Sequence, residues 1–445
     1  MSTTTKTDTR AALRPVVGGN LEVPLVTGGS VRYTNLDYAA SAPALEVVAA
    51  HVVEMLPLYA SVHRGAGYAS QVSTSAYEHA RVVVGEFVGA RPKDAVLFTR
   101  NTTDSLNLLA SIVPGETVLL DIEHHANLLP WQARGARVIR SAPTITETLV
   151  AIDAELARRP AALLTITGAS NVTGEVLPLR AIASIAHRYG TRLAVDGAQL
   201  VPHRRVSLAA QGIDYLAFSG HKTYAPFGAG VLVGRADWFD AGDPYLLGGG
   251  AVTRVALGEE TSWRSGPSRH EAGSPNVLGV AALARAVQAL AGIDEDELVA
   301  HESRLRERLV DGFAALGVAT FRIFPDSADA VGVVSFALDG VDSRLFATYL
   351  SAEWGIGVRD GKFCAHPLLA RLGSSGAALR ASIGLGSSEA DVDRLLEATR
   401  AFIENGPAWR YELVDGQWTV LDDTRPRPEW APELSASDGF YGCVA

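Results

Sequence analysis

Short, continuously apolar segments recur between residues 95 and 235, and they alternate with stretches of helical periodicity. These segments are Val96–Phe98, Thr117–Leu120, Ala161–Thr167, Arg192–Val195, Tyr215–Phe218 and Gly228–Gly234. Strands that are apolar at every position, rather than at alternate positions, are buried on both faces. The pattern therefore predicts an α/β fold in which helices cover both faces of a mostly parallel sheet.

The chain divides into four predicted parts. Residues 1–30 are rich in threonine and glycine and are predicted to form an N-terminal arm that is partly disordered. Residues 31–292 form the large domain, and residues 293–405 form a smaller α+β lobe that carries a glycine-containing loop around Cys364. In the tail, residues 406–445, two alternating segments flank Asp415-Gly416, which is a strong signal for a two-residue hairpin.

Composition narrows the class of protein. The 445 residues are 47% hydrophobic and 20% charged, which is ordinary for a globular protein, and the net charge is −10. That charge argues against a general nucleic-acid or anionic-membrane surface. No apolar run resembles a signal peptide or reaches bilayer length, so we expect a cytoplasmic protein. The two cysteines, Cys364 and Cys443, have no metal-site spacing and are predicted to be thiols.

Lys222 lies between two of the apolar runs, in a loop that two core strands would hold in place. In parallel α/β sheets, ligands collect at the carboxyl ends of the strands. A partly desolvated lysine at such a place loses its proton more easily and can form a Schiff base. The stretch by itself is equally compatible with a solvated lysine in a surface loop.

Other polar residues also follow predicted strands. They are Thr102, Thr103, His124, Asn171, Asp196 and Gln199. Taken singly, the threonines fit an ordinary helix N-cap as well as a phosphate site, and His124 fits a surface turn as well as a ring-stacking position. Together with Lys222 they supply a phosphate cradle, an imidazole, an acid, an amide and a lysine. Pyridoxal phosphate uses all five, which favours a site for that cofactor.

A set of motifs runs through the chain from about Leu36 to Ile403. The motifs are LDYAASAP, HRG, FTRNTTDSLNL, EHHANLLPW, SNVTGE, VDGAQ, FSGHK and EAGSPN, followed by a late segment with arginine and cysteine. In this order they resemble the cysteine desulfurases and selenocysteine lyases of the class V aminotransferase family, most closely the sulfur-mobilisation type. The resemblance implies the fold type I of pyridoxal-phosphate-dependent transferases, with a seven-stranded sheet in the large domain.

The resemblance also implies roles for individual residues. Lys222 would bond covalently to pyridoxal phosphate, His124 would stack on its ring and move protons, and Asp196 would pair with its pyridinium nitrogen. The other implied cofactor contacts are Thr102, Thr103, Gln199, Ser219, His221 and Ser274. Ser274 would reach the phosphate of the other subunit, so a homodimer is expected.

The implied substrate is L-cysteine, held by Asn171, Arg359 and Arg380. Cys364 would attack the substrate sulfur, so that L-alanine and an enzyme persulfide result. The sulfur would then pass to a protein acceptor for iron–sulfur cluster or other sulfur-containing biosynthesis. In a purely structural interpretation, Cys364 would be a small apolar filler.

The chain departs from the family pattern at several positions. Lys362 and Phe363 stand where two histidines are usual, Asp360 replaces a threonine, and Asn101 replaces a glycine.

These departures leave two alternative functions. One is a pyridoxal-phosphate-dependent C–S lyase, selenocysteine lyase, aminotransferase or epimerase of specialised metabolism, in which Cys364 is incidental. The other is a degenerate cofactor-binding partner in a sulfur-transfer assembly, with the tail as its docking element.

Overall fold

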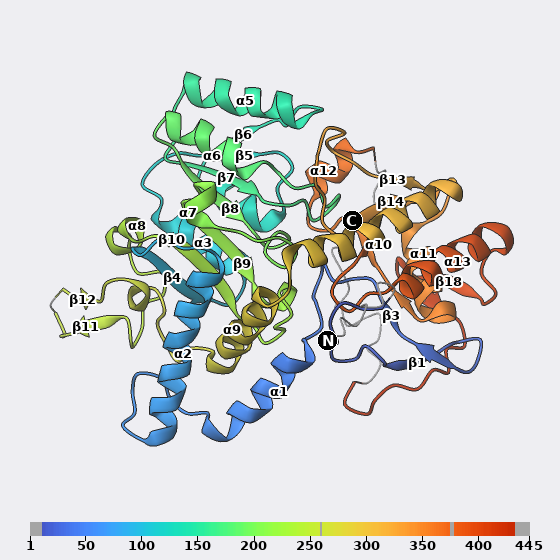
Figure 1. Cartoon of the computed structure of the whole chain (residues 1–445), viewed down its shortest axis with the longest axis horizontal. Coiled ribbons are helices and arrows are strands. Elements are labelled where there is room, and N and C mark those ends of the chain that lie inside the picture. Colours follow the sequence, from blue (N-terminus) through green and yellow to red (C-terminus); the bar gives the residue numbers. More distant parts are fainter. Residues whose placement is uncertain (1–10, 259, 374–377, 432–445) are drawn as a thin grey trace, which may run out of the picture.

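A seven-stranded sheet lies at the centre of the larger lobe (Figure 1) of the computed structural model, which describes residues 11–258, 260–373 and 378–431. In spatial order its strands are β4 (Asp94–Thr99), β10 (Gly230–Arg235), β9 (Tyr215–Ser219), β8 (Arg192–Asp196), β7 (Leu163–Thr167), β5 (Thr117–Leu120) and β6 (Arg137–Ile139). Strand β10 is antiparallel to both of its neighbours, and the remaining pairs are parallel. The predicted mostly parallel, seven-stranded sheet is confirmed.

Both faces of this sheet are buried, which is why its strands are apolar at every position. Successive side chains of a strand point to opposite faces. In β9, Leu216 and Phe218 join the apolar cluster that also contains residues of α2 (Tyr68–Phe87) and α9 (Val277–Ala291). Tyr215 and Ala217 join a second cluster, which contains residues of α3 (Thr102–Ile112). The expected helix-covered sheet therefore follows directly from this strand pattern.

The other elements of the larger lobe are short or peripheral. They are α1 (Glu46–Met55), η1 (Leu56–Leu58), η2 (His125–Asn127), α4 (Leu129–Gln132), α5 (Ile145–Arg158), α6 (Leu179–Arg188), α7 (Leu208–Gln211), η3 (Gly220–Lys222), α8 (Ala236–Ala241), β11 (Val252–Arg254), β12 (Ser262–Trp263) and η4 (Pro267–Arg269). In the described part of the chain, no single helix is long and apolar enough to cross a membrane. Helices α9 and α10 (Glu295–Ala315) meet those criteria only as a pair, with a bend of 90° between them.

The smaller lobe is built on a four-stranded antiparallel sheet with the order β13-β14-β17-β16. Besides α10, its elements are β13 (Ala319–Thr320), β14 (Val333–Ala337), α11 (Ser343–Trp354), β15 (Ile356–Gly357), β16 (Arg359–Gly361), α12 (His366–Arg371), β17 (Ala378–Ser382) and α13 (Glu389–Asn405). Its apolar core joins Phe313, Phe336, Phe346 and Leu395. The smaller α+β lobe predicted from the sequence has this form.

The N-terminal segment differs from the predicted arm. Within residues 11–30, β1 (Glu22–Pro24) pairs with β2 (Ser30–Arg32), and the amide of Leu13 donates to the carbonyl of Leu385. Strand β3 (Thr34–Asn35) pairs with β15, and Leu36 lies in the core of the smaller lobe. This segment therefore contacts the smaller lobe, while Val16 also joins the apolar cluster of the larger lobe and pairs with Leu45. Residues 1–10 lie outside the described residues.

A buried group of charges joins the two lobes. Arg204 of the larger lobe donates to Glu302 on α10 at 2.6 Å and to Asp329 at 2.7 Å, and His203 also contacts Glu302. Burial alone would raise the pKa of Glu302, but His203 and Arg204 together lower it. A buried carboxylate is tolerated only with such partners, so this group fixes how the lobes meet.

The tail packs on the smaller lobe. Strands β18 (Tyr411–Val414) and β19 (Gln417–Val420) form the predicted hairpin, and β19 contacts α11. Glu353 on α11 is only 8% exposed. Its carboxylate accepts hydrogen bonds from the amides of Ala408 and Trp409 and from the hydroxyl of Tyr411. One buried acid of α11 therefore accepts three hydrogen bonds from the first part of the tail, beside the hydrogen bond from Arg344 of α11 to the carbonyl of Gly416.

Replacing that acid should detach the tail. Glu353→Ala leaves two amides and a hydroxyl without their acceptor, a loss we expect to cost about 2–4 kcal/mol. The midpoint of thermal unfolding should fall, and limited proteolysis should cut the tail earlier than in the native chain. Glu412→Ala, at an exposed position of the same hairpin, is the matched control and should change neither measurement. Equal proteolysis of both variants would show that Glu353 does not hold the tail.

Candidate active site

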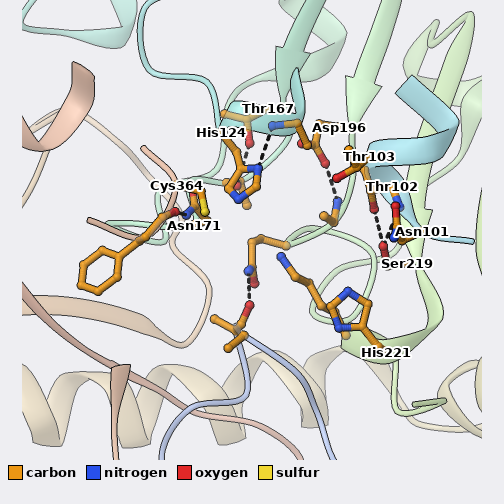
Figure 2. Close-up of a pocket in the computed structure, with 18 of the residues that line it drawn as sticks. Asn101, Thr102, Thr103, His124, Thr167, Asn171, Asp196, Ser219, His221 and Cys364 are labelled. Carbon is orange, nitrogen blue, oxygen red and sulfur yellow. Dashed lines mark hydrogen bonds between the residues drawn. The ribbon is translucent and has the colours of Figure 1, made fainter. Parts of the chain in front are cut away.

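A cavity of about 330 Å³ lies at the carboxyl ends of the parallel strands. Its walls contain nearly all the polar residues that the sequence singled out, namely Thr102, Thr103, His124, Asn171, Asp196, Gln199, Ser219, His221, Lys222, Arg359, Cys364 and Arg380. In Figure 2, Thr102, Thr103 and Ser219 lie at one side, Cys364 and Asn171 lie at the other, and His124 and Asp196 lie between them. The cavity thus has two chemically different ends.

Lys222 ends the short helix η3, which follows β9 directly. The antiparallel pairing of β9 with β10 holds this helix in place from both sides. Burial lowers the pKa of the Lys222 amine to about 8, although the nearby carboxylate of Asp196 acts in the opposite direction. A substantial fraction of the amine is therefore neutral near neutral pH and able to attack a carbonyl group.

Asp196 is the last residue of β8 and is 4% exposed. One carboxylate oxygen accepts a hydrogen bond from the amide of Ala198 at 3.0 Å. Burial raises the pKa of Asp196, while the Ala198 amide and Lys222 act to lower it. A buried carboxylate with this few partners favours a cationic or N–H-bearing ligand in the cavity.

His124 follows β5 and is the residue before η2. Its Nδ1 atom accepts a hydrogen bond from the amide of Ala126 at 3.0 Å. Burial, with Lys222 as the next cause, lowers the pKa of His124 to about 3. The ring is therefore neutral at physiological pH, and since Nδ1 is an acceptor, the ring proton is on Nε2.

The end of the cavity at which Thr102, Thr103 and Ser219 lie is suited to an anion. Helix α3 begins at Thr102, and the Thr102 amide and hydroxyl both contact the Ser219 hydroxyl, at 2.7 and 2.6 Å. Amides and hydroxyls at a helix N-terminus are a common phosphate site. A Cβ atom on Gly230 would lie 2.5 Å from the backbone of Asn101, so this glycine lets β10 approach the helix start.

His221 lies beside this end, on η3. Burial, followed by the charge of Lys222, lowers the pKa of His221 to about 4. The imidazole is thus neutral, and it acts there as a hydrogen-bonding group rather than as a charge.

The Cys364 loop reaches the cavity from the smaller lobe. Its backbone is held on the larger lobe by two hydrogen bonds, from the Asn171 side chain to the Phe363 carbonyl and from the His125 amide to the Cys364 carbonyl, each 2.8 Å long. Both Phe363 and Cys364 adopt a left-handed φ of 52°. Non-glycine residues rarely adopt this conformation, so surrounding contacts must maintain it.

Two arginines stand at the same end as Cys364. Arg359 on β16 and Arg380 on β17 lie directly opposite each other in the antiparallel pair. Like charges at such positions repel unless an anion lies between or beside them. The carboxylate of Asp37 supplies such an anion, and its Oδ1 atom lies 3.2 Å from Nη2 of Arg380. Burial raises the pKa of Asp37, and Arg380 opposes that shift.

The donor set fits pyridoxal phosphate and an amino acid. Among the described residues, two buried cavity atoms, Oε1 of Gln199 and Nε of Arg380, have no hydrogen-bond partner. Unsatisfied buried polar atoms are costly, and they favour a ligand that completes them. A helix start suited to a phosphate, a buried acid, a neutral imidazole and a lysine of lowered pKa complete the set.

Ser274 is the one predicted site residue that does not line the cavity. It is exposed, in the loop between η4 and α9, and its predicted contact with a second subunit stays a prediction.

The sequence interpretation missed Asp37 and gave Phe363 no role. Asp37 lies within the motif LDYAASAP, which was the available signal, whereas nothing local marks Phe363 as a cavity wall.

Comparisons with known proteins agree with this geometry. The sequence profile of the family described as "Aminotransferase class-V" matches residues 34–395. The chain is 36% identical over 389 residues to the cysteine desulfurase of Dickeya dadantii, covering 83% of this chain and 92% of that protein. It is 34% identical over 401 residues to the cysteine desulfurase of Haloferax volcanii, covering 86% and 93%.

Solved structures are similar as well. The apo cysteine desulfurase from Thermococcus onnurineus NA1 superposes with a TM-score of 0.78 at 30% identity, covering 88% of this chain and 99% of that chain. The cysteine desulfurase CsdA (S-sulfonic acid) from Escherichia coli gives a TM-score of 0.71 at 34% identity, covering 84% and 95%. Both likenesses extend across the two lobes.

The lowered pKa of Lys222 can be tested by labelling. The chain has only four lysines. Reaction of the cofactor-free protein with pyridoxal, trapped by borohydride and mapped by mass spectrometry, should label Lys222 with a rate that rises to half its maximum near pH 8. The exposed Lys93 supplies the reference within the same sample.

Asp196→Asn should move that midpoint further down, because it removes the negative neighbour that favours the charged amine. A midpoint near the ordinary lysine value in the native protein, or an upward movement in the Asp196→Asn variant, would contradict this electrostatic account.

Proposed function

Because this chain belongs to the aminotransferase class-V family, we propose that it is a cysteine desulfurase that converts L-cysteine into L-alanine and retains the sulfur on Cys364. Its family and relatives make it a pyridoxal-phosphate-dependent enzyme. The observation that carries the proposal is that one cavity joins Lys222, Asp196 and His124 to Cys364 and Arg380. Binding of the cofactor alone would not require Cys364 or Arg380 in the same cavity.

One set of cavity residues would hold the cofactor. The start of α3, with Thr102, Thr103 and Ser219, would hold the phosphate group, and Asp196 would accept a hydrogen bond from the ring nitrogen. When bound, pyridoxal phosphate supplies an electron sink for the bonds at the amino-acid Cα atom. Lys222 anchors the cofactor and, when its amine is released, is placed to hold a proton.

The substrate would be oriented by its carboxylate. Arg380 is 3% exposed, and its Nε atom is without a partner among the described residues, so a carboxylate can complete its hydrogen bonding. Burial lowers the pKa of Arg380, but a guanidinium stays charged at physiological pH. The neutral His124, with its proton on Nε2, is available to donate or accept a proton beside the reacting atoms.

The sulfur step conserves atoms and electrons. The Cys364 sulfur attacks the sulfur of the bound cysteine, an S–S bond forms, and the substrate C–S bond breaks with its electron pair left on carbon. Protonation of that carbon completes alanine, and Cys364 holds the persulfide. Negative charge on Cys364 would oppose the effect of burial on the pKa values of Lys222 and Arg380, so the Cys364 sulfur lies within electrostatic reach of both groups.

The remaining features of the proposal concern partners. A protein acceptor for the persulfide fits the partial exposure of Cys364. A homodimer fits the exposed position of Ser274 in a loop where Arg64 donates to the carbonyls of Gly249 and Gly273. The predicted cytoplasmic location stays a prediction.

Removing the nucleophile should separate binding from sulfur transfer. In Cys364→Ala, addition of L-cysteine should still change the absorbance of the bound cofactor, because the substrate can still bind. With an added thiol as the reductant that releases sulfide from the persulfide, formation of alanine and of sulfide should fall at least about 100-fold, the scale expected when a covalent catalyst is lost. Both products are measured by standard assays.

Cys443→Ala is the matched control, since it removes the only other cysteine. It should behave like the native enzyme. Full alanine formation by Cys364→Ala would overturn the proposal and favour a C–S lyase or another reaction in which Cys364 is incidental. Loss of the absorbance change as well would place Cys364 in binding rather than in sulfur transfer.

A further inference from the structure

Phe363 occupies an unusual position for an aromatic residue. It immediately precedes Cys364, lines the cavity and is 5% exposed. The centroid of its ring lies 5.1 Å from Cζ of Arg380. This distance is within the range in which a guanidinium is attracted to the face of an aromatic ring. A residue of the nucleophile loop therefore contacts the group that would bind the substrate carboxylate.

The hydrogen bonds of Arg380 within the described residues use only part of its donors. Nη1 donates to the Asn171 carbonyl at 3.0 Å, and Nη2 donates to Asp37. An arginine has five N–H donors in a fixed plane, so those two contacts leave three, and Nε is buried without a partner in the described residues. Phe363 adds a third contact, which also shields the guanidinium from water.

Asn171 is hydrogen-bonded to both Arg380 and Phe363. Its carbonyl accepts from Arg380, and its side-chain amide donates to the carbonyl of Phe363 at 2.8 Å. Phe363, which has a left-handed φ, is thus hydrogen-bonded through its carbonyl to the same residue that accepts from Arg380. A change of ring would therefore act on Arg380 directly.

We propose that Phe363 is a positioning residue for amino-acid recognition, whose ring holds the Arg380 guanidinium in the orientation that selects ligands with an α-carboxylate. The proposal rests on the proposed function in one respect, namely that Arg380 receives the substrate carboxylate. It adds that carboxylate selectivity is set by the residue beside the nucleophile. Ring replacement should therefore weaken carboxylate recognition while leaving amine binding intact.

The test compares two ligands that differ only in the carboxylate. Dissociation constants of L-alanine and ethylamine for the cofactor-loaded enzyme are measured by absorbance titration, and their ratio reports carboxylate selectivity. Phe363→Leu and Phe363→Met keep apolar bulk, and neither is β-branched, so both tolerate the backbone conformation better than valine or isoleucine would. We expect the ratio to fall roughly 3- to 30-fold in both variants, with ethylamine affinity changed less than about 2-fold.

Three controls sharpen the result. Phe363→Tyr retains the ring face and should retain the native ratio. Phe402→Leu, in the core of the smaller lobe, should leave the ratio unchanged. In an Arg380→Gln background, Phe363→Leu should cause no further fall, because the group through which the ring acts is gone.

The outcomes separate this inference from the proposed function. If the native enzyme does not prefer L-alanine to ethylamine, the carboxylate role of Arg380 fails, and this inference fails with it. If the native enzyme shows the preference but Phe363→Leu and Phe363→Met retain it, or weaken both ligands equally, the positioning role alone is overturned. A fall in the ratio that persists in the Arg380→Gln background also overturns it.

Discussion

Parallel pairing of β5, β7, β8 and β9 is the constraint on which the active site depends. The register places Thr167 of β7 opposite Asp196 of β8, and Asp196 opposite Ala217 of β9, so neighbouring strands end at one edge. Each strand then contributes the residues that follow its last position, which is how side chains far apart in sequence share one cavity. The sheet can hold this arrangement because both of its faces are buried, and the strands therefore cannot slide without exposing apolar side chains.

In the proposed function, the larger lobe supplies most of the residues that would hold the cofactor, and the smaller lobe supplies the nucleophile. Cys364 comes from the smaller lobe, and its loop is held on the larger lobe through Asn171 and His125. Those contacts maintain two consecutive left-handed residues, so the loop conformation depends on the seam between the lobes. The buried charges around Glu302 hold the same seam at a distance from the cavity. Sulfur chemistry thus depends on how the lobes meet, whereas cofactor binding depends mainly on the sheet.

The sheet, the strand-end residues and the tail hairpin were predictable because each leaves a local pattern, such as the continuously apolar runs or Asp415-Gly416. The pairing of β3 with β15 was not predictable, because the two strands lie more than 300 residues apart in the chain. Nor was the contact between Phe363 and Arg380, which depends on a backbone conformation that the sequence does not favour. Asp37 was missed because its partner, Arg380, is equally remote. The sequence motifs named most of the polar residues that line the cavity, and tertiary structure determined how they contact one another.

The central claim is that Cys364 receives the sulfur atom within the cofactor cavity. It is tested most directly by treating the cofactor-loaded enzyme with one equivalent of L-cysteine, quenching with an alkylating agent, and mapping both cysteines by mass spectrometry. The account predicts one added sulfur atom on the Cys364 peptide and none on the Cys443 peptide, in an amount equal to the alanine formed. Alanine formed without added sulfur on Cys364, or with sulfur only on Cys443, would contradict it.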